Sequence, residues 1–278
     1  MPKIEVTSFT SPKAIPSLRD AEEVFRGITR ALGVIYSCLV PNQRGAERAL
    51  AVKVDEINLV MSVSETHNLA NLRMTREQSY AQLAETIRVV RHSGIVTNAS
   101  LSACFGCPME GPVAEAEVWR FSERLLAAGA GGISLCDTTG MAHPAQVAGM
   151  VEEFRRRFPT AALALHLHNT RGMGQANILA ALQAGADRFD ASLGGLGGCP
   201  YAPGATGNVC TEDLVHMLEA MGFTTGIDLG LLIECARRLP EIVGHDVPGQ
   251  VAKAGGIQDL HPEPAWLAEV REKARERG

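Results

Sequence analysis

Two histidines two residues apart, His166 and His168, are the sharpest chemical feature of the sequence. They close the segment Ala162–His168, whose alternating composition is typical of a strand. Alternate side chains of a strand share a face, so we predict that both imidazoles point into the fold with Ala164, while Leu163, Leu165 and Leu167 pack outward. Converging neutral imidazoles suit a divalent metal. The alternative is a hydrogen-bonded core pair, which is less favoured because each buried ring needs partners.

The second feature is the glycine-rich segment Gly194–Asn208, which holds six glycines and two prolines in 15 residues. Such a loop can approach a substrate closely or close over it. Cys199 lies in its middle, where an accessible thiol could donate or accept a proton or act as a nucleophile. A flexible turn holding a small apolar residue explains the same pattern equally well.

The elements that must position these groups alternate between short apolar runs and longer amphipathic segments. This order predicts parallel strands with helical crossovers in one α/β domain, a TIM (β/α)8-type barrel of which seven strands are recognisable. The expected strands are 3–9, 34–40, 56–63, 96–103, 132–136, 162–168 and 188–193, and the clearest helices are 76–91, 114–128, 144–158, 174–184 and 211–221.

Polar residues gather where these strands end, which is the active face of a barrel. Asp137 and Thr138 follow one strand and can orient a ligand, although Asp-Thr turns also cap helices. Cys104 and Cys107 have CxxC spacing without a second pair for zinc, so we expect structural thiols near the site.

Composition excludes several classes of function. The 278 residues carry a net charge of −5, which gives no basic surface for nucleic acid. No apolar run is long enough to span a membrane, and no signal peptide is apparent, so we expect a cytoplasmic protein. Seven cysteines in a long chain indicate reduced thiols rather than a disulfide framework.

These motifs resemble the 3-hydroxy-3-methylglutaryl-CoA (HMG-CoA) lyases of the DRE-TIM metallolyase superfamily. The resemblance extends from residue 3 to about 256. It is carried by the His166 strand and the Cys199 segment, and is supported by the following segments: 4–9 with 11–13, 64–65, 105–108 with 110–111, 134–138 and 211–215.

The resemblance implies a metal-dependent retro-Claisen cleavage of a 3-hydroxyacyl-CoA, which for HMG-CoA gives acetyl-CoA and acetoacetate. It implies that His166, His168 and Asn208 bind Mg²⁺ or Mn²⁺ and that Cys199 assists proton transfer. The remaining implied site residues are acidic (Glu5, Asp137, Glu212), or contact the acyl-CoA substrate (Asn71, Thr75 and Thr138).

The sequence also departs from the family. The Arg-Asp pair that ends the family's first barrel strand is absent from the chain as written, which lacks the first βα unit. The remaining ligands are neutral, so we predict weak metal binding and impaired or absent lyase activity. Asn98 and Ser100 lie on the strand where the best-known lyases carry Arg and Tyr, and Asn169 replaces an Asp, so a related hydroxyacyl-CoA is also plausible.

We expect residues 1–257 to form the barrel, matching strands 2 to 8 of the family, and residues 258–278 to form a charged tail. Two unpaired sheet edges predict a homo-oligomer, most simply a dimer. Two alternatives stay open. One is an acetyl-CoA-dependent synthase of the isopropylmalate type, disfavoured by the short C-terminal region. The other is a catalytically inactive barrel subunit.

Overall fold

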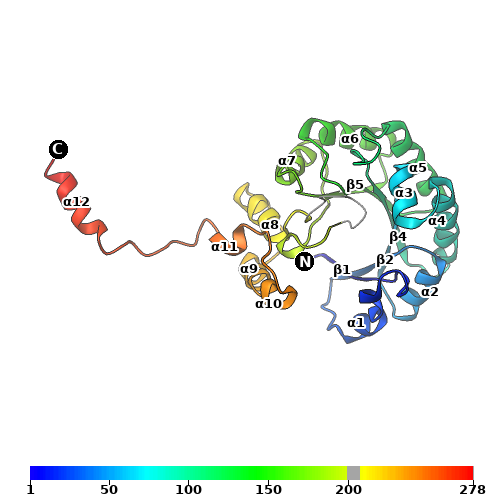
Figure 1. Cartoon of the computed structure of the whole chain (residues 1–278), viewed down its shortest axis with the longest axis horizontal. Coiled ribbons are helices and arrows are strands. Elements are labelled where there is room, and N and C mark those ends of the chain that lie inside the picture. Colours follow the sequence, from blue (N-terminus) through cyan, green and yellow to red (C-terminus); the bar gives the residue numbers. More distant parts are fainter. Residues whose placement is uncertain (199–206, 278) are drawn as a thin grey trace.

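The computed structural model describes residues 1–198 and 207–277. Seven parallel strands form one sheet in chain order, and the sheet curls so that helices cover its outer face (Figure 1). The strands are β1 (Lys3–Ser8), β2 (Ile35–Val40), β3 (Glu56–Ser62), β4 (Val96–Ser102), β5 (Gly132–Asp137), β6 (Ala162–Leu167) and β7 (Phe189–Asp190). The predicted α/β class and barrel-type architecture are therefore confirmed.

Helices follow the strands along the chain, and all but the C-terminal helix pack with the rest of the fold. They are α1 (Ala21–Gly27), α2 (Gln43–Ala51), α3 (Glu65–Leu72), α4 (Arg76–Arg91), α5 (Glu115–Ala128), α6 (Pro144–Arg157), α7 (Gly174–Gln183), α8 (Thr211–Ala220), α9 (Leu229–Arg237), α10 (Leu239–Val243), α11 (Val251–Ala254) and α12 (Leu267–Arg275). Helix α4 has the predicted bounds because Thr75 and Gln78 form a capping box at its start.

The core lies between the sheet and the helices. Leu163, Leu165 and Leu167 of β6 are fully buried, whereas Ala164 and His166 are only partly buried on the opposite face. The predicted alternation of β6 is thus confirmed. Because parallel strands packed against helices bury their outward residues, this layer fixes which side chains face the interior.

Strand β7 is shorter than predicted. The expected strand 188–193 contains only two strand residues, because the chain turns away after Asp190. The Ser192 amide donates to the Val209 carbonyl, and Leu193–Gly195 forms a turn of 3₁₀ helix. The start of the glycine-rich segment is therefore fastened to residues just beyond its far end.

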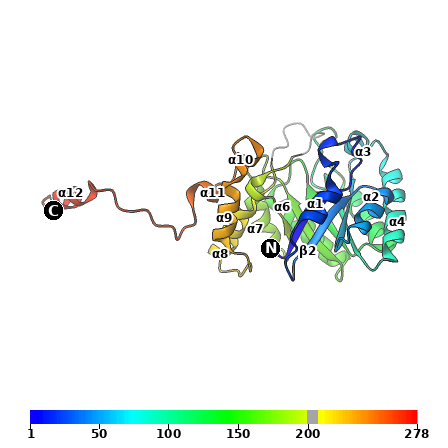
Figure 2. The same cartoon turned by 90° about the horizontal axis from the view of Figure 1, so that it is seen from below.

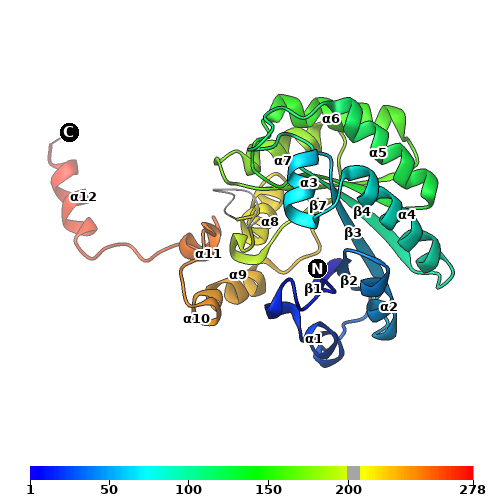
Figure 3. The same cartoon turned by 45° about the vertical axis from the view of Figure 1, so that its right-hand side comes forward.

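The sheet is open on one side. Within the described residues β1 pairs only with β2, and β7 pairs only with β6 (Figure 3). Beyond α11 the chain runs away from the sheet and ends in the separate helix α12 (Figures 1 and 2). None of the helices in the described part of the chain has the length and apolar character needed to cross a bilayer.

Candidate active site

The two predicted metal-binding histidines converge at the end of β6. Their Nε2 atoms lie 3.3 Å apart, with the rings inclined at 60°. Burial lowers the pKa of His168 to about 4 and also lowers that of His166. Both imidazoles are therefore neutral near pH 7, the state in which a ring nitrogen offers a lone pair to a metal.

Asn208 lies directly beside this pair. It forms an antiparallel bridge with His168, and its Nδ2 donates to the Leu196 carbonyl at 2.8 Å. Its Oδ1 is buried and accepts no hydrogen bond from the described residues. A buried acceptor without a partner among the described residues is costly, so the amide oxygen of this residue, whose backbone is bridged to His168, fits a cation-binding role.

The donor set is neutral. Within residues 1–198 and 207–277, no three His, Cys, Asp or Glu side chains converge as a metal centre would require. Two imidazole nitrogens and one amide oxygen can hold a divalent cation, but a hard cation such as Mg²⁺ prefers carboxylate oxygen. The residues present can therefore bind a divalent metal, and their neutral donors favour a low affinity for it.

Asp190 is a site residue that the sequence analysis did not single out. Its Oδ2 lies 3.8 Å from His166 Nδ1, so its negative charge faces the ring nitrogen on the side away from His168. Its charge also raises the pKa of Glu5. The only sequence signal was its place in the last predicted strand, which gave no indication of which face it occupies.

Glu5 faces the interior from β1, at the open side of the sheet. Asn58 Nδ2 donates to Glu5 Oε2 at 3.0 Å. Glu5 is exposed to solvent at the open edge of the sheet, yet the groups packed around its carboxyl oxygens remove enough hydration to raise its pKa to about 7. Glu5, Asp190 and His166 therefore belong to one electrostatic group, spanning the first and the last two strands.

Asp137 and Thr138 bind the backbone of the loops around them. Asp137 accepts from the amides of Met141 and Ala142, and Thr138 Oγ1 accepts from the Ala103 amide. Ala103 has a left-handed backbone with φ of 59°, so this contact holds a strained turn at the mouth. Both side chains shape the mouth, and their predicted contacts with substrate stay predictions.

Glu212 holds the start of the glycine-rich segment. Its Oε2 accepts from the Gly194 amide at 3.0 Å, while its buried Oε1 accepts nothing from the described part of the chain. Burial raises its pKa. A side chain on Gly249 would come within 2.2 Å of Oε1, so the carboxyl group is tightly enclosed. The Glu212 carboxyl group thus lies between Gly194, to which it is hydrogen bonded, and Gly249, against which it packs.

The other predicted residues lie further out or cannot be placed. Asn71 is half-buried near the end of α3, and Thr75 caps α4 through a hydrogen bond from the Gln78 amide. Cys199 lies outside the described residues. Cys104 and Cys107 are buried free thiols, as expected of structural cysteines.

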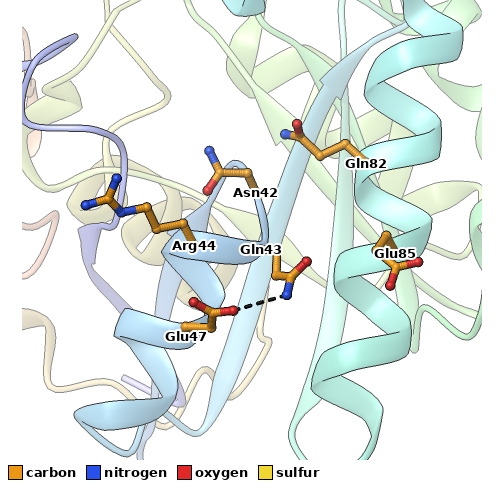
Figure 4. A pocket seen from close by; sticks show the side chains of 6 residues that line it. All are labelled: Asn42, Gln43, Arg44, Glu47, Gln82 and Glu85. Carbon is orange, nitrogen blue, oxygen red and sulfur yellow. Dashed lines mark hydrogen bonds between the residues drawn. The ribbon is translucent and has the colours of Figure 1, made fainter.

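A polar cleft of about 580 Å³ opens elsewhere, between α2 and α4 (Figure 4). Its lining includes Gln43 and Glu47, which are hydrogen bonded to each other. It contains none of the predicted site residues and no convergent buried group. We therefore place the candidate active site at the histidine pair and not in this cleft.

A curled parallel sheet with a histidine pair at its mouth defines a barrel-type site in which two neutral imidazoles could hold a divalent cation. The HMGL-like family model matches residues 2–239. The chain belongs to this HMGL-like family, which confirms the resemblance drawn from the motifs.

Three relatives show how similar the chain is in sequence and structure to known lyases. The chain is 47% identical over 247 residues to the hydroxymethylglutaryl-CoA lyase YngG of Bacillus subtilis, covering 89% of this chain and 83% of the relative. It is 39% identical over 267 residues to (R)-citramalyl-CoA lyase of Chloroflexus aurantiacus, covering 92% and 84%. The structure of an Acinetobacter baumannii HMG-CoA lyase, in complex with coenzyme A and 3-methylmalate, matches with a TM-score of 0.91 and 53% identity, covering 95% and 86%.

Proposed function

We propose that this protein cleaves a 3-hydroxyacyl-CoA by a metal-dependent retro-Claisen reaction. The observation that carries the proposal is the convergence of His166 and His168, together with the bridge from His168 to Asn208, whose buried amide oxygen has no partner among the described residues. The lyase names of the relatives at 47% and 39% identity support the same reaction.

We propose that His166 Nε2, His168 Nε2 and Asn208 Oδ1 hold the cation, Mg²⁺ or Mn²⁺. When bound, the metal lowers the pKa of the substrate's tertiary hydroxyl and draws charge from the forming carbonyl. Asp190 supports this arrangement through its charge, because a carboxylate 3.8 Å from His166 Nδ1 favours the tautomer with the proton on Nδ1 and leaves Nε2 for the cation.

The chain's own groups move the protons. With a pKa near 7, Glu5 can accept the proton of the 3-hydroxyl at neutral pH. The C2–C3 bond then breaks: its electrons form the thioester enolate, and C3 becomes the ketone. Cys199 donates a proton to C2, which releases acetyl-CoA. Asp137, Thr138 and Glu212 position the surrounding loops, and Asn71 and Thr75 contact the CoA moiety.

The substrate is HMG-CoA or a close analogue. HMG-CoA and (R)-citramalyl-CoA, the substrates in the names of two relatives, both carry a hydroxyl on the carbon β to the thioester carbonyl. The neutral side chains Asn98 and Ser100 line the interior near Asn58. Their N–H and O–H donors are engaged by Asn58 and Ser134, so these two side chains present no fixed charge to the substrate's carboxylate.

We also propose impaired turnover, a dimer and a cytoplasmic location. The neutral donor set supports weak metal binding and therefore slow catalysis by the chain as written. The six described cysteines are free thiols, which is typical of a reducing compartment. The unpaired edges of β1 and β7 support self-association.

The test is product release from HMG-CoA with and without Mn²⁺. A lyase forms acetyl-CoA from HMG-CoA. A synthase is tested in a parallel reaction with acetyl-CoA and a 2-oxo acid, in which it would free the CoA thiol. An inactive barrel forms neither product. Acetyl-CoA released only with metal supports the proposal, and free thiol or no product rejects it.

A further inference from the structure

A chain of hydrogen bonds crosses the barrel interior behind Glu5. Asn58 on β3 donates from Nδ2 to Glu5 Oε2 at 3.0 Å. Asn58 Oδ1 in turn accepts from Asn98 Nδ2 at 3.0 Å and from Ser100 Oγ at 2.8 Å. Asn98 Nδ2 also donates to Ser134 Oγ at 2.9 Å. The contacts therefore link β1, β3, β4 and β5.

Strand register places these residues together. Asn58 is the direct partner of Asn98, and Ser100 is the direct partner of Ser134. Ile57 and Leu59, which flank Asn58 along β3, are fully buried on the opposite face. Alternation therefore directs the amides and hydroxyls to the interior, where the uncovered polar groups must satisfy one another.

The contacts fix the orientation of the Asn58 amide. Two donors, from Asn98 and Ser100, occupy its oxygen, so its NH₂ group is the part that remains for Glu5. Turning the amide over would set its NH₂ against the Asn98 NH₂ and its oxygen against the Glu5 carboxylate. Asn58 is therefore held as a donor toward Glu5.

We propose that Asn58 is a positioning residue that, oriented by Asn98 and Ser100, holds the Glu5 carboxylate in place and favours its ionised form. The inference rests on the proposed function in one respect, namely that Glu5 takes up the substrate proton. The hydrogen bond itself exists whether or not the chain turns over.

The surroundings of Glu5 support this assignment. Burial raises the pKa of Glu5 most, and the charges of Asp190 and Glu56 raise it further. The Asn58 hydrogen bond is the strongest influence lowering that pKa, ahead of the Lys3 charge. Lys3 is itself paired with Glu56 at 2.5 Å, and the nearby Cys38 thiol, with a pKa of about 12, is uncharged.

The test follows the Glu5 carboxyl carbon by ¹³C NMR during a pH titration of the full chain, with the signal assigned by its loss in Glu5→Gln. The parent should titrate near pH 7. Asn58→Ala removes the donor, so the midpoint should rise by about one pH unit, the effect expected of a hydrogen bond to a charged group. Asn58→Asp keeps the shape but presents only oxygens, and should raise the midpoint at least as far.

Asn98→Ala is the matched control. It removes a neighbouring interior amide and leaves the Asn58–Glu5 contact, so its midpoint should rise less than that of Asn58→Ala. Circular dichroism checks that each variant is folded. Unchanged midpoints in folded Asn58→Ala and Asn58→Asp overturn the proposal, as does a larger shift in Asn98→Ala.

The titration needs no substrate, so it separates this inference from the proposed function. A shifted midpoint in a chain that cleaves no thioester keeps the Asn58 assignment and rejects the reaction. Metal-dependent cleavage by a chain whose Asn58 variants leave the Glu5 midpoint unshifted keeps the reaction and rejects the Asn58 assignment. Where turnover is measurable, the pH profile of kcat should move with the midpoint while KM changes little.

Discussion

His166 and His168 present their Nε2 atoms to each other at 3.3 Å from the end of one strand. Two neutral imidazoles this close share a small space that suits a single cation, because each then offers its lone pair to the same point. We expect His168→Ala to weaken Mn²⁺ binding by at least about tenfold. Titration calorimetry measures the change.

The exposed His92 provides the control for that experiment, since it lies on the surface after α4. His92→Ala should leave the Mn²⁺ affinity unchanged. If both variants bind Mn²⁺ as the parent does, the cation is held elsewhere and the assigned ligands are wrong.

Gly249 is expected to tolerate no side chain. A methyl group there would meet Glu212 Oε1 and displace the carboxyl group that holds Gly194. We expect Gly249→Ala to destabilise the fold by about 1–3 kcal/mol, the usual result of overpacking. Gly149 lies in α6 with open space around it, so Gly149→Ala should instead stabilise by about 0.5–1 kcal/mol. Urea unfolding measures both variants. Equal unfolding midpoints for Gly249→Ala and Gly149→Ala would contradict the close packing of Gly249 against the Glu212 carboxyl group.

Asp137 should make stability depend on pH. Burial raises its pKa from an ordinary value of 3.8 to about 6. Between these values the folded state binds the proton more tightly than the unfolded state, so this contribution to stability is present at low pH and is lost as pH rises to about 6. The slope from this one group reaches at most roughly 1.4 kcal/mol per pH unit.

Urea unfolding of the parent and Asp137→Asn between pH 3.5 and 7 isolates this effect, because the other carboxyl groups cancel in the difference. The parent's advantage over the variant should shrink as pH rises through the window from about 4 to 6. Parallel curves would mean that Asp137 titrates normally in the folded chain.

The acyl group can be assigned from the ketone product. Cleavage of HMG-CoA yields acetoacetate, whereas cleavage of (R)-citramalyl-CoA yields pyruvate, and both yield acetyl-CoA. We expect both substrates to be cleaved, with rates within about a hundredfold of each other, since their acyl groups differ by one methylene and a methylene is worth about 1–3 kcal/mol of discrimination. Separate assays with chromatography of the ketone decide this, and a preference above a hundredfold for either substrate would show a dedicated charged contact.

Sequence reasoning reached the fold because local signals agreed with the global pattern. The strands alternate with helices that are capped by nearby residues of the chain, such as Thr75 at the start of α4. The alternation in β6 also gave the direction of both histidines. The end of β7 was missed because its short extent depends on the Ser192–Val209 contact, which joins residues 17 positions apart.

The site was less accessible to prediction than the fold. The convergence of His166 and His168 follows from their spacing, but the place of Asp190 beside His166 depends on the pairing of β6 with β7. The backbone contacts of Asp137 and Thr138 arise from loop geometry that no spacing encodes. The Asn58 contact with Glu5 joins residues from β3 and β1, which the curvature of the sheet brings together.

The most direct test of the account is the rate of metal-dependent acetyl-CoA release from HMG-CoA by the parent chain, by His168→Ala and by the Bacillus subtilis relative YngG. We expect a slow release by the parent that requires Mn²⁺, no release by His168→Ala, and a much faster rate for YngG. Release that is independent of metal or unaffected in His168→Ala would contradict the assigned site. A parent rate equal to that of YngG would contradict the proposal that neutral ligands bind the metal weakly and slow turnover. No release at all would reject the lyase reaction for this chain.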